Sequence, residues 1–271
     1  MNILVCIKQV PESNHVTTDP TTGVLKRDGV DSKLNPYDLY AIELALTLRE
    51  RFGGKVQTLT MGPAQAKEAV LESLYMGVDE GWVVSDPAFA GSDVLATSYA
   101  LSQAVKKTGA ADLILCGRQT TDGDTAQVGV ELAEWLGLLH TTHVTSVETA
   151  DRGSITVRTS TEDHVRTEKL LLPCLLCTGD RINTPRLPSY RRKQKLEEGS
   201  LHWLTLADLA DPDPGHYGLE ASPTQVVRIF QPEKKKEKKI IKGTAGEVAD
   251  TLYRLLEKEK LIQEADTWQR S

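Results

Sequence analysis

A polar loop at residues 117–128, with the sequence GRQTTDGDTAQV, has the side chains expected of a nucleotide-binding turn. Gly123 permits the close approach of a ligand or a positive φ. Gln119 and Gln127 supply amides that can hydrogen-bond to an adenine or ribose edge. The same residue types also form ordinary turns without a ligand, but the length of this loop favours nucleotide binding.

The loop connects a predicted buried strand to a predicted helix. The apolar run from Ala111 to Cys116 is typical of a parallel strand, and Ala126 to Leu136 has the pattern of a helix that ends at Gly137. Thr125 or Asp124 can cap that helix. Because a helix N-terminus offers free N–H donors and a partial positive charge, we expect an anion to bind between the strand and the helix.

Strands and helices alternate through the first half of the chain, which predicts a doubly wound, mostly parallel α/β sheet of the Rossmann-like type. The predicted strands are 2–10, 56–61 and 80–84, and the predicted helices begin after Asn35, at Ala64 and at Asp93. Open sheets bind ligands at the carboxyl ends of their strands. The other candidate walls of the site at this edge are Cys6, Met61 and the turn from Asn35 to Asp38.

The residues after Gly137 predict strands of a different kind. Runs of β-branched residues indicate antiparallel strands added to the same sheet, at 141–147, 155–160, 165–172 and 173–178. A hairpin turn at 151–153 joins the first two. A further hairpin is expected between Val16 and Leu25.

From about residue 179 the chain loses regular periodicity. The segment 180–198 is rich in Arg and Lys and predicts an exposed basic loop or short helix. An arm at 211–232 leads through a Lys-rich linker at 234–239 to an amphipathic helix at 244–261. Apolar residues in such an arm indicate that it lies on a partner chain. We therefore expect an α/β nucleotide-binding domain at 1–210 and a C-terminal arm with its helix at 211–271.

The overall composition is that of an ordinary soluble globular protein. The chain has 271 residues, 39% of them hydrophobic, and a formal net charge of -6, which argues against a general nucleic-acid surface. No apolar run reaches about 18 residues and no leader opens the chain. We expect a cytoplasmic protein without membrane insertion.

The sequence offers no obvious catalytic or metal-binding group. The CxxC pair Cys174 and Cys177 lies in a Leu-rich strand, so we interpret it as core and not as a redox or zinc site, for which His140 and His143 fit only loosely. The motifs GxGxxG, GxxxxGK[ST] and GxSxG are absent, and no residue stands out as a nucleophile.

Six segments of the sequence, in order, resemble the β subunit of electron transfer flavoproteins. They are NILVCIKQVP, LNPYD with AIELAL, TMGPA, MGVD, LILCGRQTTDGDTAQVG and SPTQV. The resemblance implies an α/β fold that pairs with a larger α subunit carrying the electron-transferring FAD. It also implies a nucleotide held by Cys6, Asn35, Pro36, Tyr37, Asp38, Met61, Gly117, Arg118, Gln119, Thr120, Thr121, Asp122, Gly123, Asp124, Thr125, Ala126, Gln127 and Val128.

The loop at residues 117–128 distinguishes two branches of that family. Members with a structural AMP have a sequence like QAIDDDxNQTG, whereas this chain has DGDTAQVG, similar to flavin-based electron-bifurcating members. The resemblance to that branch implies a second FAD here, which takes a hydride from NADH. One electron would go to ferredoxin, and the other through the α-subunit FAD to a flavin-dependent acyl-CoA or 2-hydroxy-acid dehydrogenase. A structural AMP remains the alternative.

The resemblance also assigns residues 178–196 to partner recognition, with Leu187 as the exposed leucine that docks in a dehydrogenase. The alternative is that Leu187 packs locally. A reading of another class, an adenine-nucleotide-sensing module without redox function, leaves the C-terminal arm unexplained.

Overall fold

The computed structural model describes residues 1–12, 17–18, 25–26, 32–123, 125–197, 199–227 and 240–262. They form two compact units, which divide between Ile229 and Phe230. Residues 211–222 therefore belong to the first unit, where the side chain of Tyr217 is buried against Phe89 and Tyr99. The second unit contains helix α6 (Ala245–Lys258).

The first unit is built on a nine-stranded sheet of order β11-β10-β9-β12-β8-β1-β6-β7-β13. Seven neighbouring strands of this sheet run parallel: β9, β12, β8, β1, β6, β7 and β13. Strands β10 and β11 add an antiparallel extension at the β9 edge. The strands of this sheet are β1 (Ile3–Cys6), β6 (Val56–Met61), β7 (Glu80–Val84), β8 (Leu113–Gly117), β9 (Leu139–Ala150), β10 (Ser154–Ser160), β11 (Val165–Leu171), β12 (Cys174–Thr178) and β13 (Leu201–Leu204). The doubly wound, mostly parallel α/β fold is confirmed.

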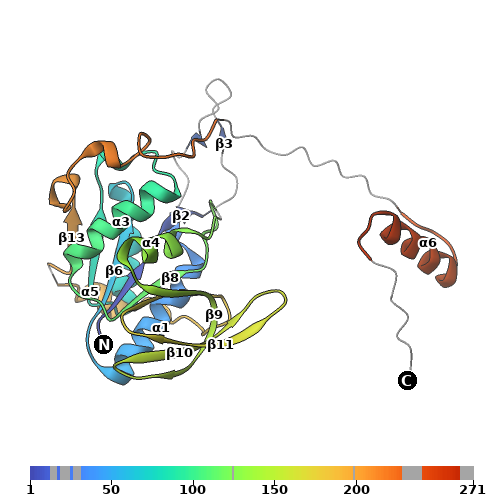
Figure 1. Ribbon diagram of the computed structural model, residues 1–271, viewed down its shortest axis with the longest axis horizontal. Helices are drawn as coiled ribbons and strands as arrows, with labels where there is room; N and C mark the ends of the chain where they lie inside the picture. Colours follow the sequence, from blue (N-terminus) through green and yellow to red (C-terminus); the bar gives the residue numbers. More distant parts are fainter. Residues whose placement is uncertain are drawn as a thin grey trace. The chain divides into compact units, whose positions relative to one another are not determined.

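Helices cover both faces of the sheet (Figure 1). Helices α1 (Pro36–Phe52) and α2 (Lys67–Met76) pack on one face, and α3 (Val94–Thr108) and α4 (Val128–Leu136) on the other. Their sequences carry the expected boundaries: Pro36 opens α1, the Asp93 side chain caps α3 by accepting from Ala96 N, and Gly137 ends α4 with a φ of 65°.

Two small hairpins lie outside the large sheet. Strand β2 (Gln9–Pro11) pairs antiparallel with β5 (Ser32–Leu34), and β3 (Thr17–Thr18) pairs antiparallel with β4 (Leu25–Lys26). The second pairing confirms the hairpin predicted between Val16 and Leu25.

The structure differs from the predictions in several places. Of the strands expected to be antiparallel after Gly137, β9 and β12 run parallel to β8, and only β10 and β11 form the antiparallel extension. Residues 201–204 form the edge strand β13, which was missed because four residues carry too little periodicity. The helix expected from Ala126 begins at Val128. The terminal helix ends at Lys258 and not at Leu261. The Lys-rich run at 234–239 lies outside the described residues.

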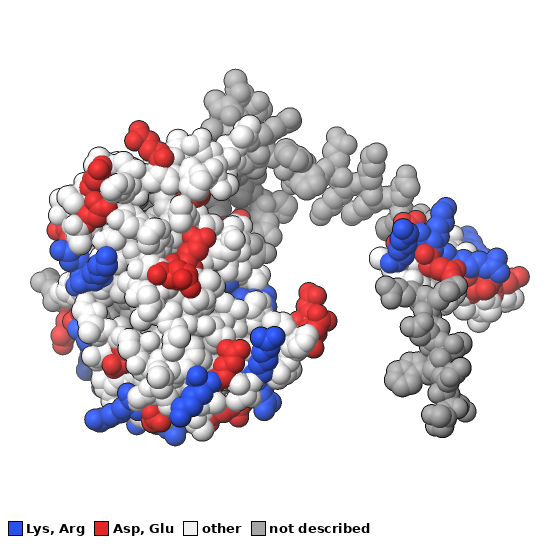
Figure 2. All heavy atoms as spheres, viewed as in Figure 1, with Lys and Arg blue, Asp and Glu red and all other residues white. Residues whose placement is uncertain are grey.

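None of the helices in the described ranges is long and apolar enough to cross a membrane. On the face drawn in Figure 2, acidic and basic side chains of the first unit are interspersed. A polyanion therefore meets no continuous basic surface on this face.

Candidate functional site

The strand order reverses direction at the centre of the sheet, between β1 and β8. From β1 the chain moves outward through β6 and β7, and α3 then crosses to the opposite face and delivers the chain to β8 on the other side of β1. Ligands of open α/β sheets bind at the carboxyl edge of such a switch point. The loop that follows β8 is the one singled out in the sequence, so its predicted residues lie at this crevice.

Asp38, in the first turn of α1, joins the walls of the crevice. Its carboxylate accepts the main-chain N–H of Lys8 at 2.7 Å and the side-chain amide of Asn35 at 2.9 Å, and it lies so close to Gly117 that a Cβ there would come 2.2 Å from the Asp38 Oδ1. The end of β1, the start of α1 and the end of β8 are therefore connected through one side chain. Burial raises the pKa of Asp38 to about 7, against the lowering effect of these hydrogen bonds and of the Lys8 charge.

Replacing Asp38 with asparagine should remove a pH dependence of stability. The pKa of Asp38 in the folded protein lies above its ordinary value of 3.8, so the unfolded chain loses this proton at a lower pH than the folded chain. The contribution of protonated Asp38 to the free energy of unfolding is therefore complete below pH 3.8 and is lost as the pH rises towards about 7. Between pH 5 and pH 7 we expect wild type to lose on the order of 2–3 kcal/mol relative to Asp38→Asn. Urea unfolding of both proteins at pH 5, 6, 7 and 8 measures this difference. A difference that stays constant with pH would contradict the assignment.

Asn35 is fully buried at the N-cap position of α1, but its side chain makes no capping hydrogen bond to the helix. Its amide nitrogen instead donates to Asp38 and, at 2.9 Å, to the carbonyl oxygen of Gln119. The Asn35 side-chain oxygen is fully buried and has no hydrogen-bond partner among the described residues. An unsatisfied buried acceptor is costly, and an N–H group of a ligand such as adenine would satisfy it.

No described side chain of the loop after β8 caps the first turn of α4. Gln127 occupies the N-cap position without a side-chain cap, so the prediction that Thr125 caps this helix is wrong. Among the described residues of the loop, Ala126 has a left-handed backbone, with a φ of 57°, while Gly123 does not. The first N–H groups of α4 consequently face no side-chain acceptor among the described residues, which suits a phosphate. Asp124 lies outside the described residues.

A cation that the sequence analysis missed spans the crevice. The Lys8 ammonium group, beyond the end of β1, forms an ion pair at 2.8 Å with Asp122 of the loop after β8. Arg118 lies over the Tyr37 ring, 5.5 Å from its centroid, and its Nε donates to the side-chain oxygen of Gln119 at 2.7 Å. Lys8 could have been predicted from its position, two residues after the buried strand β1, which ends at the switch point of the sheet.

Three cysteines lie side by side on the central strands. Cys6, Cys116 and Cys177 occupy matching positions on β1, β8 and β12, and all are buried free thiols. Hydrogen bonding to Cys177 and Cys6, together with burial, raises the pKa of Cys116, so the Cys116 thiol stays neutral. A Cβ on Gly129 would lie 2.6 Å from the Cys177 sulfur, so this glycine lets α4 sit directly on the strands.

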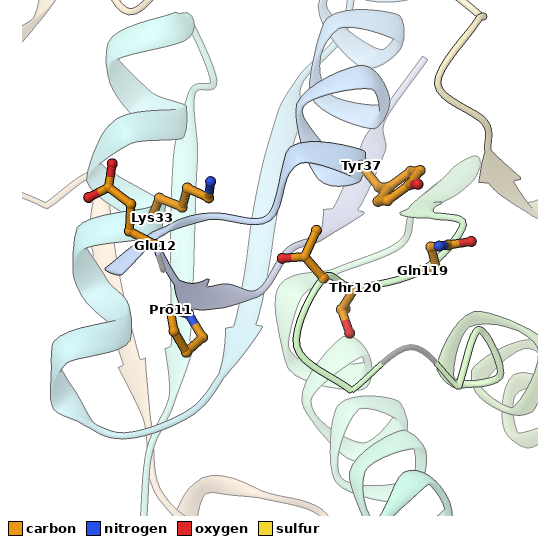
Figure 3. Close-up of a pocket in the computed structure, with 7 residues that line it drawn as sticks. Pro11, Glu12, Lys33, Tyr37, Gln119 and Thr120 are labelled. Atoms are coloured by element: carbon orange, nitrogen blue, oxygen red, sulfur yellow. The ribbon is translucent and has the colours of Figure 1, made fainter. Parts of the chain in front are cut away.

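A polar pocket of about 400 Å³ opens beside the crevice (Figure 3). Tyr37 and Gln119 lie on one side of it, and Glu12 and Lys33 of the β2–β5 hairpin lie on the other. Pro11, Thr120 and Thr121 complete its lining. The start of α1 and the loop after β8 thus border both the crevice and the pocket.

Other predicted residues lie nearby on the same edge. Met61 ends β6, two residues beyond Leu59, which pairs with Cys6 on the neighbouring strand, and Pro36 is the first residue of α1. The exposed side chains of Thr125, Ala126 and Gln127 precede Val128, where α4 begins. The described members of the predicted set therefore gather at the carboxyl edge.

Comparison with known proteins assigns the family. The model of the electron transfer flavoprotein domain matches residues 22–202. The chain belongs to the electron transfer flavoprotein family. It is 40% identical over 262 residues to electron transfer flavoprotein subunit beta of Thermoanaerobacterium thermosaccharolyticum, a match that covers 97% of this chain and 100% of that protein.

Two further relatives carry other names. Caffeyl-CoA reductase-Etf complex subunit CarD of Acetobacterium woodii is 42% identical over 264 residues, covering 97% of this chain and all of that protein. Protein FixA of Azorhizobium caulinodans is 41% identical over 244 residues, covering 88% and 87% of the two chains. Similarity along the whole length to β subunits supports an electron-transfer role beside an α subunit.

In this electron transfer flavoprotein chain, the segment before α5 (Tyr190–Gln194) is fixed at its base. Arg186 donates through its main-chain N–H, Nε and Nη2 to Glu43 and through Nη1 to Glu50, both on α1. The Ser189 N–H donates to the carbonyl oxygen of Tyr75 at 2.9 Å. Between these anchors the side chain of Leu187 is 87% exposed, so it does not pack locally.

Proposed function

We propose that this chain is the β subunit of a bifurcating electron transfer flavoprotein and that the crevice between β1 and β8 binds FAD. The observation that carries the proposal is the sequence DGDTAQVG in the loop at this switch point. It is similar to bifurcating members, and the relative named for a caffeyl-CoA reductase complex gives further support.

The residues of the chain bind and orient the nucleotide in this proposal. The buried Asn35 oxygen accepts an adenine N–H, and the open first turn of α4 donates to phosphate. A Cβ on Gly123 would meet no described atom closer than the Thr120 hydroxyl at 3.9 Å, which supports a site where a pyrophosphate continues past AMP. No side chain acts as a general acid or base.

FAD would supply the redox chemistry, taking a hydride from NADH and passing single electrons to ferredoxin and, through the α-subunit FAD, to a partner dehydrogenase. The deciding experiment is to purify the heterodimer and count its cofactors. Two FAD per heterodimer is the expected result. One FAD plus one AMP would replace it with the structural-AMP alternative, and a colourless heterodimer would favour a nucleotide-sensing module without redox function.

We further propose that the C-terminal unit packs on the α subunit. Helix α6 begins with a capping box between Thr244 and Glu247, and none of its side chains is buried in the described structure. Leu252 and Tyr253 are among its exposed apolar residues, which a partner surface would cover. Deletion of residues 230–271 should weaken co-purification with the α subunit, and unchanged recovery of the heterodimer would refute this. A cytoplasmic location belongs to the same proposal, and cell fractionation tests it.

Leu187 is the proposed docking residue for a flavin-dependent acyl-CoA or 2-hydroxy-acid dehydrogenase. Leu187→Ala should leave the free energy of unfolding unchanged, because the side chain is exposed. If the side chain is buried in the partner, its loss should weaken electron transfer to the dehydrogenase about tenfold to a hundredfold. Transfer rates measured against dehydrogenase concentration test this. Leu171→Ala, at an exposed leucine on β11, is the matched control, and equal effects of the two changes would contradict docking at Leu187.

A further inference from the structure

The ion pair between Lys8 and Asp122 crosses the crevice where the proposed nucleotide phosphate would lie. The Lys8 main chain is fixed on both sides, because its N–H donates to Asp38 and its carbonyl accepts from Asn35 N at 2.9 Å. Its side chain is 45% exposed and can move, while its origin at the end of β1 cannot. The crevice therefore contains a lysine whose main chain is fixed and whose ammonium group can move.

Asp122 places a carboxylate on that cation. Partial burial would raise the pKa of Asp122, but the hydrogen bond and charge of Lys8 outweigh this effect and hold the pKa below its ordinary value. The group is therefore an anion at neutral pH. A phosphate can replace the Asp122 carboxylate on Lys8 for two reasons. The ion pair is partly exposed, and exposed ion pairs contribute little to stability. A phosphate also carries more charge and more acceptor oxygens than a carboxylate.

The surroundings of the pair favour an anion as the replacement. The first turn of α4 follows the same loop and lacks a side-chain cap among the described residues. Its free N–H groups would share with Lys8 a phosphate that entered the crevice. The loop carboxylate would then be released to solvent, since it would repel the phosphate.

We propose that Lys8 is the phosphate-binding cation of the crevice and that Asp122 occupies it until a nucleotide displaces the carboxylate. This inference rests on the proposed nucleotide site. It adds a residue and a competition: Asp122 opposes nucleotide binding, while Lys8 supports it. Two substitutions that break the same ion pair should therefore have opposite effects.

The test compares AMP with adenosine, since AMP is common to both candidate cofactors and adenosine lacks the phosphate. Calorimetry is done on the heterodimer of the full chain with its α subunit, after removal of nucleotide from the β-subunit site. We expect wild type to prefer AMP. Lys8→Gln should bind AMP about tenfold to a hundredfold more weakly with adenosine affinity unchanged, Lys8→Arg should restore most of the loss, and Asp122→Asn should bind AMP more tightly.

Lys55→Gln is the matched control. Lys55 has a similar exposure, 42%, and pairs with Glu80 before β6, at the opposite edge of the sheet. Weaker AMP binding in both Lys8→Gln and Asp122→Asn would mean that the pair is structural, and would overturn the proposal. An undiminished preference for AMP in Lys8→Gln would overturn the role of Lys8 alone. Failure of folded wild type to bind AMP, adenosine or FAD would overturn the nucleotide site itself and this inference with it.

Discussion

Gly117→Ala is expected to lower stability strongly and to abolish nucleotide binding. An added Cβ would lie 2.2 Å from the Asp38 carboxylate and 2.8 Å from the Tyr37 carbonyl carbon. The second atom is main chain, so the end of β8 or the start of α1 must move. Overpacking of this kind costs about 1–3 kcal/mol, and we expect the upper end of that range.

The loss of binding follows from the same displacement. Asp38 holds the ends of β1 and β8 against α1, so a shift of α1 separates the walls of the crevice. Thermal unfolding and AMP calorimetry on the purified heterodimer measure the two effects. Gly153→Ala is the control, because the added Cβ there meets only the Asp151 carboxylate at an ordinary 3.6 Å. Equal stability and binding in the two variants would show that the close approach at Gly117 is not required.

Gly123→Leu is expected to expel FAD from the β-subunit site while AMP still binds. Gly123 is exposed, and an added Cβ would meet no described atom closer than the Thr120 hydroxyl at 3.9 Å, so the protein should fold while the larger side chain fills the room proposed for the second phosphate of FAD. The heterodimer should then fall from two FAD to one, with AMP recovered in its place. Flavin absorbance and chromatography of the released nucleotides give both counts.

A graded variant separates volume from backbone effects. Gly123→Ala adds a single methyl group, for which the structure has space, and should retain most of the flavin. Two FAD per heterodimer in Gly123→Leu would contradict the steric account of cofactor choice. It would leave the identity of the bound nucleotide to be decided by the cofactor count alone.

The sequence predicted the helices and strands around the site well because the residues that begin and end helices act locally. Pro36, Asp93 and Gly137 mark helix ends through their own backbone and capping preferences, and these held in the structure. The alternation of strands and helices predicted the parallel sheet, and with it the edge where the loop after β8 lies.

What the sequence did not predict depends on residues far apart in the chain. Asparagine is a residue type that often caps helices, but the side-chain amide of Asn35 instead donates to the Asp38 carboxylate and to the carbonyl oxygen of Gln119, 84 residues away. Lys8 and Asp122 are 114 residues apart and become partners only when β1 and β8 are adjacent. The start of α4 was misplaced because Ala126 adopts a left-handed conformation, which residue type does not foretell for alanine.

The anchored loop around Leu187 has a consequence for how such proteins diverge. Arg186 and Ser189 hold the loop to α1 and α2 through contacts that do not involve the leucine side chain. Position 187 can therefore accept another side chain without loss of folding stability, because nothing in the described fold depends on it. If this loop selects the dehydrogenase, a lineage could acquire a new redox partner by single substitutions there, while selection on the cofactor site continued undisturbed.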